Sequence, residues 1–150
     1  MSRKDFAAVF GKTEPLAILV ADDTPDLQAL ITMWLEDAGH HVTRAANGRE
    51  ILAHARGEEF DLLVTDILMP DGDGWEAIAG VHQLHPALPV LAISGGTREM
   101  PASAVLRVAR GAGAISWLEK PFSRLEFYGA ILRVLSGRRA EAQSHSAVPQ

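Results

Sequence analysis

The sequence contains no cysteine and only three lysines among its 150 residues. Without thiols, a disulfide-linked scaffold, thiol catalysis and cysteine-based zinc or iron–sulfur sites are excluded. Acidic side chains outnumber basic ones, 19 to 14, which gives a net charge of -5. Because non-specific binding to nucleic-acid phosphates needs clustered Lys and Arg, we do not expect nucleic acid to be a partner.

Long apolar segments are also missing. The longest uninterrupted one, Leu16–Ala21, has six residues, whereas a membrane-spanning helix needs about 20. Arg3 and Lys4 near the N-terminus are not followed by an apolar core, so we expect no signal peptide. With 47% hydrophobic and 22% charged residues, the composition is that of a globular domain. The prediction is a cytoplasmic protein with no membrane partner.

Short apolar runs alternate with segments of helical periodicity along the chain. Five runs have the length of a strand: Leu16–Ala21, His41–Ala45, Phe60–Thr65, Pro89–Ser94 and Ala114–Leu118. His41–Ala45 fits an edge strand because only some of its positions are apolar. The near-continuous apolar character of the others is typical of a parallel sheet that is covered on both faces.

Helical segments fill the spaces between these runs. Three helix starts carry recognisable capping residues, at Thr24–Pro25, Asn47–Glu50 and Ser123–Glu126. The stretches Trp75–Leu84 and Ala102–Arg110 occupy the other helical positions. The order is therefore strand–helix repeated five times, which predicts an α/β fold of the (βα)5 type: a doubly wound, five-stranded parallel sheet between layers of helices.

The chain has the length of one ordinary domain and shows no internal repeat. We expect residues 1–14 to form an N-terminal arm and residues 15–136 to form the folded domain. Residues 137–150 are polar and aperiodic, which favours a disordered C-terminal tail.

Polar side chains follow four of the predicted strands. Asp22 and Asp23 come after the first strand, Asp66 after the third, Ser94 ends the fourth, and Lys120 follows the fifth. In an open parallel sheet, ligands bind beyond the carboxyl ends of the strands. We therefore expect three carboxylates, one hydroxyl and one ammonium to meet in one small region.

Such a group of side chains is suited to phosphoryl chemistry. Three neighbouring carboxylates repel one another, so one is driven to protonate unless a cation binds. Carboxylate oxygens select a hard cation such as Mg²⁺. An exposed Asp can act as a nucleophile while the metal and a Lys neutralise charge on the transferred oxygens, and Ser94 can add a hydrogen bond.

Each of these residues also has a simpler structural explanation. An acidic pair can begin a helix, a carboxylate can decorate a loop, and a Ser before two glycines is a common turn residue. Lys120 is harder to dismiss, because Lys4 and Lys12 lie in the predicted arm and Lys120 is the one lysine in the folded region.

With these residues identified, residues 15–136 resemble the receiver domain of two-component response regulators. Four segments carry the resemblance: ILVADD at 18–23, DLLVTDILMPDGDGWE at 61–76, AISGG at 92–96 and GAISWLEKPF at 113–122. The resemblance implies a flavodoxin-like fold with strand order 2-1-3-4-5. It also implies a cytoplasmic phosphoprotein of a bacterial phosphorelay.

The resemblance assigns roles to the same residues. Asp66 is expected to accept a phosphoryl group from a histidine kinase or a histidine phosphotransfer protein. Mg²⁺ would be held by Asp22, Asp23, Asp66 and the backbone carbonyl of Leu68. Ser94 and Lys120, with the backbone N–H groups of Ile67 and Gly95, would contact the phosphoryl oxygens. Such a domain catalyses its own phosphorylation and dephosphorylation, and so is a switch rather than a turnover enzyme.

Two features depart from the family pattern. Trp117 stands where the family mostly has a Tyr or Phe that turns inward together with Ser94, and a Trp held in one position is an equally good interpretation. The segment between Ser94 and Lys120 is longer than usual, which leaves the form of the output surface open. Val105, Leu106 and Arg107 could belong to a surface for homodimer formation or to the core.

Two functions are compatible with these residues. The first is a single-domain response regulator that switches a protein–protein interaction surface, with its downstream target unknown. The alternative is a non-phosphorylated receiver-fold interaction or scaffold module. A metal-dependent small-molecule phosphatase ranks third because no cap or substrate-binding insert is evident. We do not expect a DNA-binding regulator, because no segment after the fifth predicted helix has the pattern of a helix-turn-helix.

Overall fold

The computed structural model describes residues 15–69, 74–96 and 116–147 together with positions 101, 103 and 107. The strands are β1 (Ala17–Ala21), β2 (His41–Ala45), β3 (Leu62–Asp66), β4 (Val90–Ser94) and β5 (Ser116–Glu119). The helices of this part of the chain are α2 (Pro25–Asp37), α3 (Gly48–Gly57), α4 (Gly74–Leu84) and α6 (Arg124–Ala147).

The five strands form one parallel sheet in the order β2-β1-β3-β4-β5. This confirms the predicted α/β class and strand order, including the edge position of His41–Ala45. The predicted helix at Ala102–Arg110 lies almost wholly outside the described residues, as do the predicted arm at residues 1–14 and the pairing residues Val105 and Leu106.

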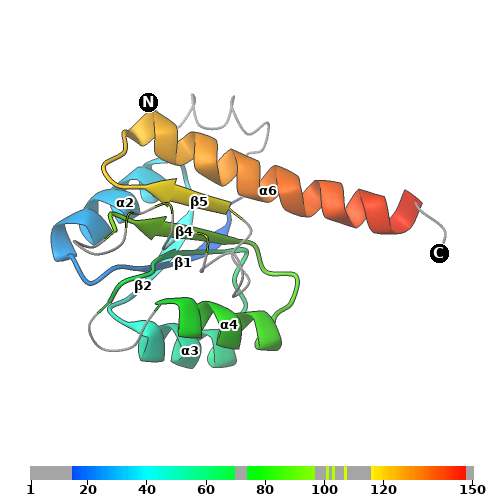
Figure 1. The fold of residues 1–150 in the computed structure, drawn as a ribbon, viewed down its shortest axis with the longest axis horizontal. Coiled ribbons are helices and arrows are strands. Elements are labelled where there is room, and N and C mark those ends of the chain that lie inside the picture. The colour runs from blue at the N-terminus through cyan, green and yellow to red at the C-terminus, as the bar shows by residue number, and fades with distance from the viewer. Residues whose placement is uncertain are drawn as a thin grey trace.

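Helices cover both faces of the sheet, with α3 and α4 on one face and α2 and α6 on the other (Figure 1). Each face has its own apolar core. Ile51, Ile78 and Val81 belong to the α3–α4 core, whereas Ile31 and Ile131 belong to the α2–α6 core. The central strands β3 and β4 are buried along their whole length, as expected for apolar strands between two helical layers.

The predicted capping residues begin their helices. Thr24 is the N-cap of α2 and Pro25 follows at its first position. The Asn47 side chain accepts a hydrogen bond of 2.9 Å from the Glu50 amide. Ser123 and Glu126 exchange two hydrogen bonds, of 3.1 and 3.0 Å, between side chain and backbone. In α3 and α6 these local bonds satisfy first-turn amides and set where the helix starts. The Thr24 side chain makes no such bond, and α2 starts with Pro at its first position instead.

The C-terminal helix is longer than the sequence pattern predicts. It continues to Ala147, so residues 137–147 are helical where a disordered tail is predicted. The prediction relied on the missing apolar periodicity of this stretch. However, Ala, Arg, Glu and Gln have high intrinsic helix propensity, and no proline occurs between Pro121 and Pro149. In Figure 1 this part of α6 extends beyond the sheet.

Gly74 begins α4 in close contact with the backbone at the end of β3. Its amide donates a hydrogen bond of 2.8 Å to the carbonyl of Ile67. A Cβ at this position would clash with the carbonyl oxygen of Asp66 and lie 2.7 Å from the Cα of Ile67. Both contacts are with backbone atoms, so a side chain can fit only if the end of β3 moves.

We therefore predict that Gly74→Ala lowers the free energy of unfolding by about 1–3 kcal/mol, the usual cost of forcing extra atoms into a packed site. Urea denaturation monitored by circular dichroism measures it. Gly57→Ala is the matched control, because a Cβ there has no neighbour within 4 Å; it should leave stability unchanged or slightly raised. Equal effects of the two substitutions would contradict the packing argument.

Candidate functional site

Four neighbouring strands bring the predicted site residues together at their carboxyl ends. Asp22 directly follows β1, Asp66 ends β3, Ser94 ends β4 and Lys120 directly follows β5. The strands are parallel and adjacent, and the register pairs Asp66 with Ile93 and Ser94 with Glu119. The topology of the sheet therefore gathers residues that are distant in the sequence.

Lys120 makes ion pairs with two carboxylates of this group. Its Nζ lies 2.7 Å from Oδ2 of Asp66 and 3.4 Å from Oδ2 of Asp22. Both carboxylate side chains are nearly buried, at 6% and 1% exposure, while the lysine side chain is 24% exposed. The lysine side chain is thus partly exposed to solvent, whereas the two carboxylates that it contacts are not.

The environment shifts the pKa values of both partners. Burial raises the pKa of the Asp66 carboxyl above its ordinary value, against the hydrogen bond and charge of Lys120, which lower it. Burial alone would lower the pKa of Lys120, but its hydrogen bond with Asp66 and the charges of Asp66 and Asp22 outweigh that effect and raise it. The ammonium therefore remains charged at neutral pH.

Asp22, Asp23 and Asp66 form an acidic cluster. One carboxylate oxygen from each lies within 4.8 Å of the others. Oδ1 of Asp22 accepts a hydrogen bond of 2.7 Å from the Thr24 amide. Oδ2 of Asp22 is buried and, apart from the ion pair with Lys120, has no hydrogen-bond partner in the described structure.

This cluster fits a hard divalent cation. Its donors are carboxylate oxygens, one of which is buried and available, and the three carboxylates exceed the single ammonium in charge. A cation such as Mg²⁺ would relieve this repulsion and satisfy the buried oxygen. The donor chemistry is therefore the one that the sequence predicts.

Ser94 is fully buried at the end of β4. Its hydroxyl accepts a hydrogen bond of 3.0 Å from the amide of Gly96, a residue with a φ of 78°. Its carbonyl accepts a hydrogen bond of 3.0 Å from the Lys120 amide, which ties the ends of β4 and β5 together. The hydroxyl proton is still available for donation to an anion.

The two backbone amides that follow Asp66 have different partners. The Ile67 amide, which we expected to contact phosphoryl oxygens, donates a hydrogen bond of 3.0 Å to the carbonyl of Ile93. The Leu68 amide donates to Oδ1 of Asp66 at 3.2 Å. The sheet ladder continues past Asp66 for one residue, and no sequence pattern indicates this. The amide beside the carboxylate is therefore that of Leu68.

Two further predicted residues lie on β5 and directly after β4. Trp117 is on β5, where it pairs in register with Ala92, and is 40% exposed. A Cβ built on Gly95 would make ordinary contacts of 3.6 and 3.8 Å with the Lys120 side chain. Gly95 consequently leaves a small space beside the aliphatic part of the Lys120 side chain.

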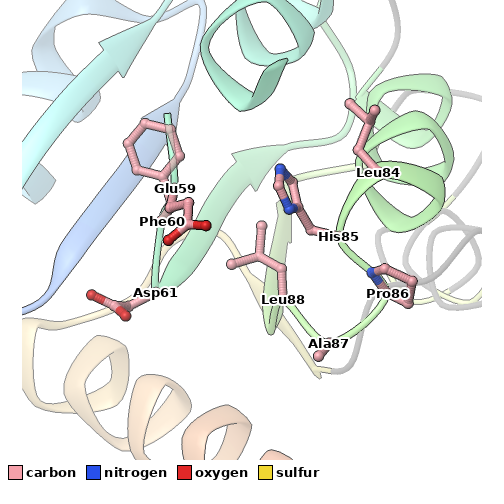
Figure 2. Close-up of a pocket in the computed structure, with 8 residues that line it drawn as sticks. All are labelled: Glu59, Phe60, Asp61, Leu84, His85, Pro86, Ala87 and Leu88. Atoms are coloured by element: carbon pink, nitrogen blue, oxygen red, sulfur yellow. The ribbon is translucent and has the colours of Figure 1, made fainter. Parts of the chain in front are cut away.

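A cavity of about 540 Å³ lies away from this site. It is formed by the segments that lead into β3 and β4, at the amino ends of the strands (Figure 2). The residues that line it are Glu59, Phe60, Asp61, Leu84, His85, Pro86, Ala87 and Leu88. Because the acidic cluster is at the opposite ends of the same strands, this cavity is not part of it.

Several known proteins are similar to this chain. An uncharacterized 14.6 kDa protein from Leptolyngbya boryana is 40% identical over 111 residues, which are 73% of this chain and 82% of that protein. The transcriptional regulatory protein TcrA of Mycobacterium tuberculosis is 34% identical over 85% of this chain. The match spans 49% of TcrA, so this chain corresponds to about half of that relative.

Solved structures show the same architecture. The chemotaxis protein CheY4 of Vibrio cholerae superposes with a TM-score of 0.72 at 29% identity, covering 81% of this chain and 99% of that one. A CheY-like receiver domain protein from Methanospirillum hungatei gives a TM-score of 0.76 at 26% identity, covering 85% and 99%. Residues 18–132 match the response regulator receiver domain family. The chain therefore belongs to the receiver domain family of response regulators, the phosphoryl-accepting domains of two-component signalling.

Proposed function

We propose that this protein is a single-domain response regulator in which Asp66 accepts a phosphoryl group in a Mg²⁺-dependent reaction. The observation that carries the proposal is the 2.7 Å contact between Lys120 and the buried Asp66 within the acidic cluster. It supports the proposal because a nucleophilic carboxylate and a fixed positive charge stand at the place where a dianionic group would arrive. The phosphoryl donor would be the phosphohistidine of a histidine kinase or of a phosphotransfer protein.

In the transfer step, an oxygen of the Asp66 carboxylate attacks phosphorus. The phosphorus–nitrogen bond to the donor histidine breaks, the imidazole leaves with the electron pair, and an acyl phosphate forms on Asp66. Asp22, Asp23, Asp66 and the Leu68 carbonyl would hold Mg²⁺, which when bound neutralises charge on the phosphoryl oxygens. Asp22 is already oriented for this role, because the Thr24 amide fixes its other oxygen.

The remaining site residues act on the transferred group. Lys120 exchanges its contact with Asp66 for one with a phosphoryl oxygen, and the Gly95 amide donates to another. Ser94 releases the Gly96 amide and turns its hydroxyl to the phosphoryl group. This movement would carry the segment after β4, and the neighbouring Trp117, into the output state.

The output is a contact with another protein, whose identity the site does not specify. The chain spans about half of TcrA, a relative named as a transcriptional regulator, and nearly all of CheY4, named as a chemotaxis protein. We propose that this protein acts by protein–protein contact and without binding nucleic acid, because acidic side chains outnumber basic ones, 19 to 14. None of the helices in the described ranges has the length and apolar character needed to cross a membrane.

The principal alternative is a receiver-fold scaffold that is never phosphorylated. It predicts a folded protein with the same surfaces but no chemistry at Asp66. The complete set of carboxylates, hydroxyl and ammonium at the strand ends favours the phosphoacceptor. Clustered like charges destabilise a fold, and a scaffold that binds neither a cation nor a phosphoryl group has no need of them.

We predict that acetyl phosphate adds one phosphoryl group to the wild-type protein in the presence of Mg²⁺ and none after chelation. Asp66→Asn should abolish the adduct because the amide is not a nucleophile. Intact-mass spectrometry measures both. Asp37→Asn is the matched control, since Asp37 pairs with Arg124 on the α2–α6 side, and it should keep the adduct. An adduct that survives Asp66→Asn would sink the assignment, and no adduct on the wild type would favour the scaffold.

We also predict that Gly95→Ala lengthens the lifetime of the phosphoryl group severalfold. The added methyl fits at ordinary contact distance from Lys120 and occupies space through which a water could reach phosphorus. Decay of the adduct after removal of acetyl phosphate, followed by intact mass, gives the lifetime. The phosphorylation site itself should be unaffected. A shorter or unchanged lifetime would show that this space does not control hydrolysis.

A further inference from the structure

The side chain of Gln28 makes two hydrogen bonds that join the ends of two strands. Gln28 lies in the first turn of α2 and is partly buried. Its Nε2 donates at 3.2 Å to the carbonyl of Asp22, directly after β1, and at 2.8 Å to the carbonyl of Ala45, at the end of β2. An amide nitrogen carries two hydrogens, so both donors are used.

Together with two other hydrogen bonds, the contact with Gln28 holds Asp22 in one conformation. Its amide donates to the Ala45 carbonyl at 3.3 Å, and its Oδ1 accepts from Thr24. With the carbonyl held by Gln28, the polar atom of Asp22 left for a ligand is the buried Oδ2. The conformation of Asp22 is thus set by its neighbours before any cation binds.

The same contact acts on Asp23. The carbonyl of Asp22 belongs to the peptide unit that leads into Asp23, and a peptide unit is planar. A hydrogen bond that orients this carbonyl therefore also orients the bond from which Asp23 continues. Gln28 consequently influences two of the three carboxylates in the acidic cluster, although it contributes no charge to it.

The Ala45 carbonyl, to which Gln28 bonds, lies just before the start of α3. Ala46 follows β2, and its amide donates to Glu50 at 3.0 Å, while Asn47 caps the helix. The Ala45 carbonyl therefore belongs to a segment that is held from both sides. By bonding to the carbonyls of both Ala45 and Asp22, Gln28 ties the acidic turn between β1 and α2 to this segment.

We propose that Gln28 is a positioning residue for the divalent cation site, acting through the peptide unit between Asp22 and Asp23. This inference rests on the proposed function. Gln28 holds the ligands in place without touching the cation or the reacting atoms. Its loss should weaken cation binding and leave the chemical step unchanged once the cation is bound, as for other groups that orient metal ligands.

The test uses Gln28→Met, which keeps the size of the side chain and removes its donors, and Gln83→Met as the matched control at an exposed position of α4. Titration of the unphosphorylated proteins with Mg²⁺, followed by ¹H–¹⁵N NMR, gives the dissociation constant. We expect it to rise about tenfold in Gln28→Met and to stay unchanged in Gln83→Met. Gln28→Asn, whose shorter amide cannot reach both carbonyls, is a second variant and should also weaken binding.

Rates of phosphorylation by acetyl phosphate at increasing Mg²⁺ separate positioning from general damage to the fold. Gln28→Met should need more Mg²⁺ to reach half of its maximal rate and should then reach the wild-type maximum. An unchanged dissociation constant in both Gln28 variants, with or without a loss of stability to urea, overturns the inference alone. Wild-type protein that binds Mg²⁺ but forms no adduct overturns the proposed function alone, and wild type that binds no Mg²⁺ overturns both.

Discussion

The arrangement of this protein depends on holding three carboxylates and a single ammonium together at one edge of a parallel sheet. Lys120 contacts Asp66 and Asp22, yet the cluster still carries more negative than positive charge. The carboxylates repel one another, so the packing of the rest of the fold must offset this repulsion to keep them in place. Because of this repulsion, the site favours binding of a cation. A cation and then a phosphoryl group would each change the net charge of the cluster.

The fold supplies that restraint through backbone contacts. Burial of β3 and β4 between two apolar cores fixes the strand that ends in Asp66. Gly74 allows α4 to begin directly against the backbone of Asp66. On the other side of the site, Gln28 fixes the acidic turn after β1. Gly74 and Gln28, which are both neutral, thus position the charged residues without adding charge to the cluster. The negative charge of the carboxylates can therefore interact with a bound cation.

Sequence reasoning succeeds where the signal is local or follows from topology. Capping residues such as Asn47 and Ser123 mark helix starts because their bonds span only three residues. Asp66 and Lys120 could be placed together because parallel strands end at the same edge. The partners of Gln28 and of the Ile67 amide could not be predicted, because both depend on where distant backbone carbonyls lie. The length of α6 was missed since helix propensity acts there without an apolar pattern.

The proposed function requires that Asp66, and no other carboxylate of the cluster, carries the phosphoryl group. An acyl phosphate can be reduced with borohydride to the corresponding alcohol, which converts the phosphorylated aspartate to homoserine and leaves free carboxylates intact. Peptide mapping by mass spectrometry after this treatment identifies the position directly. We expect homoserine at position 66 only. Homoserine at position 22 or 23, or none in protein that carries the adduct, would contradict the assignment of Asp66.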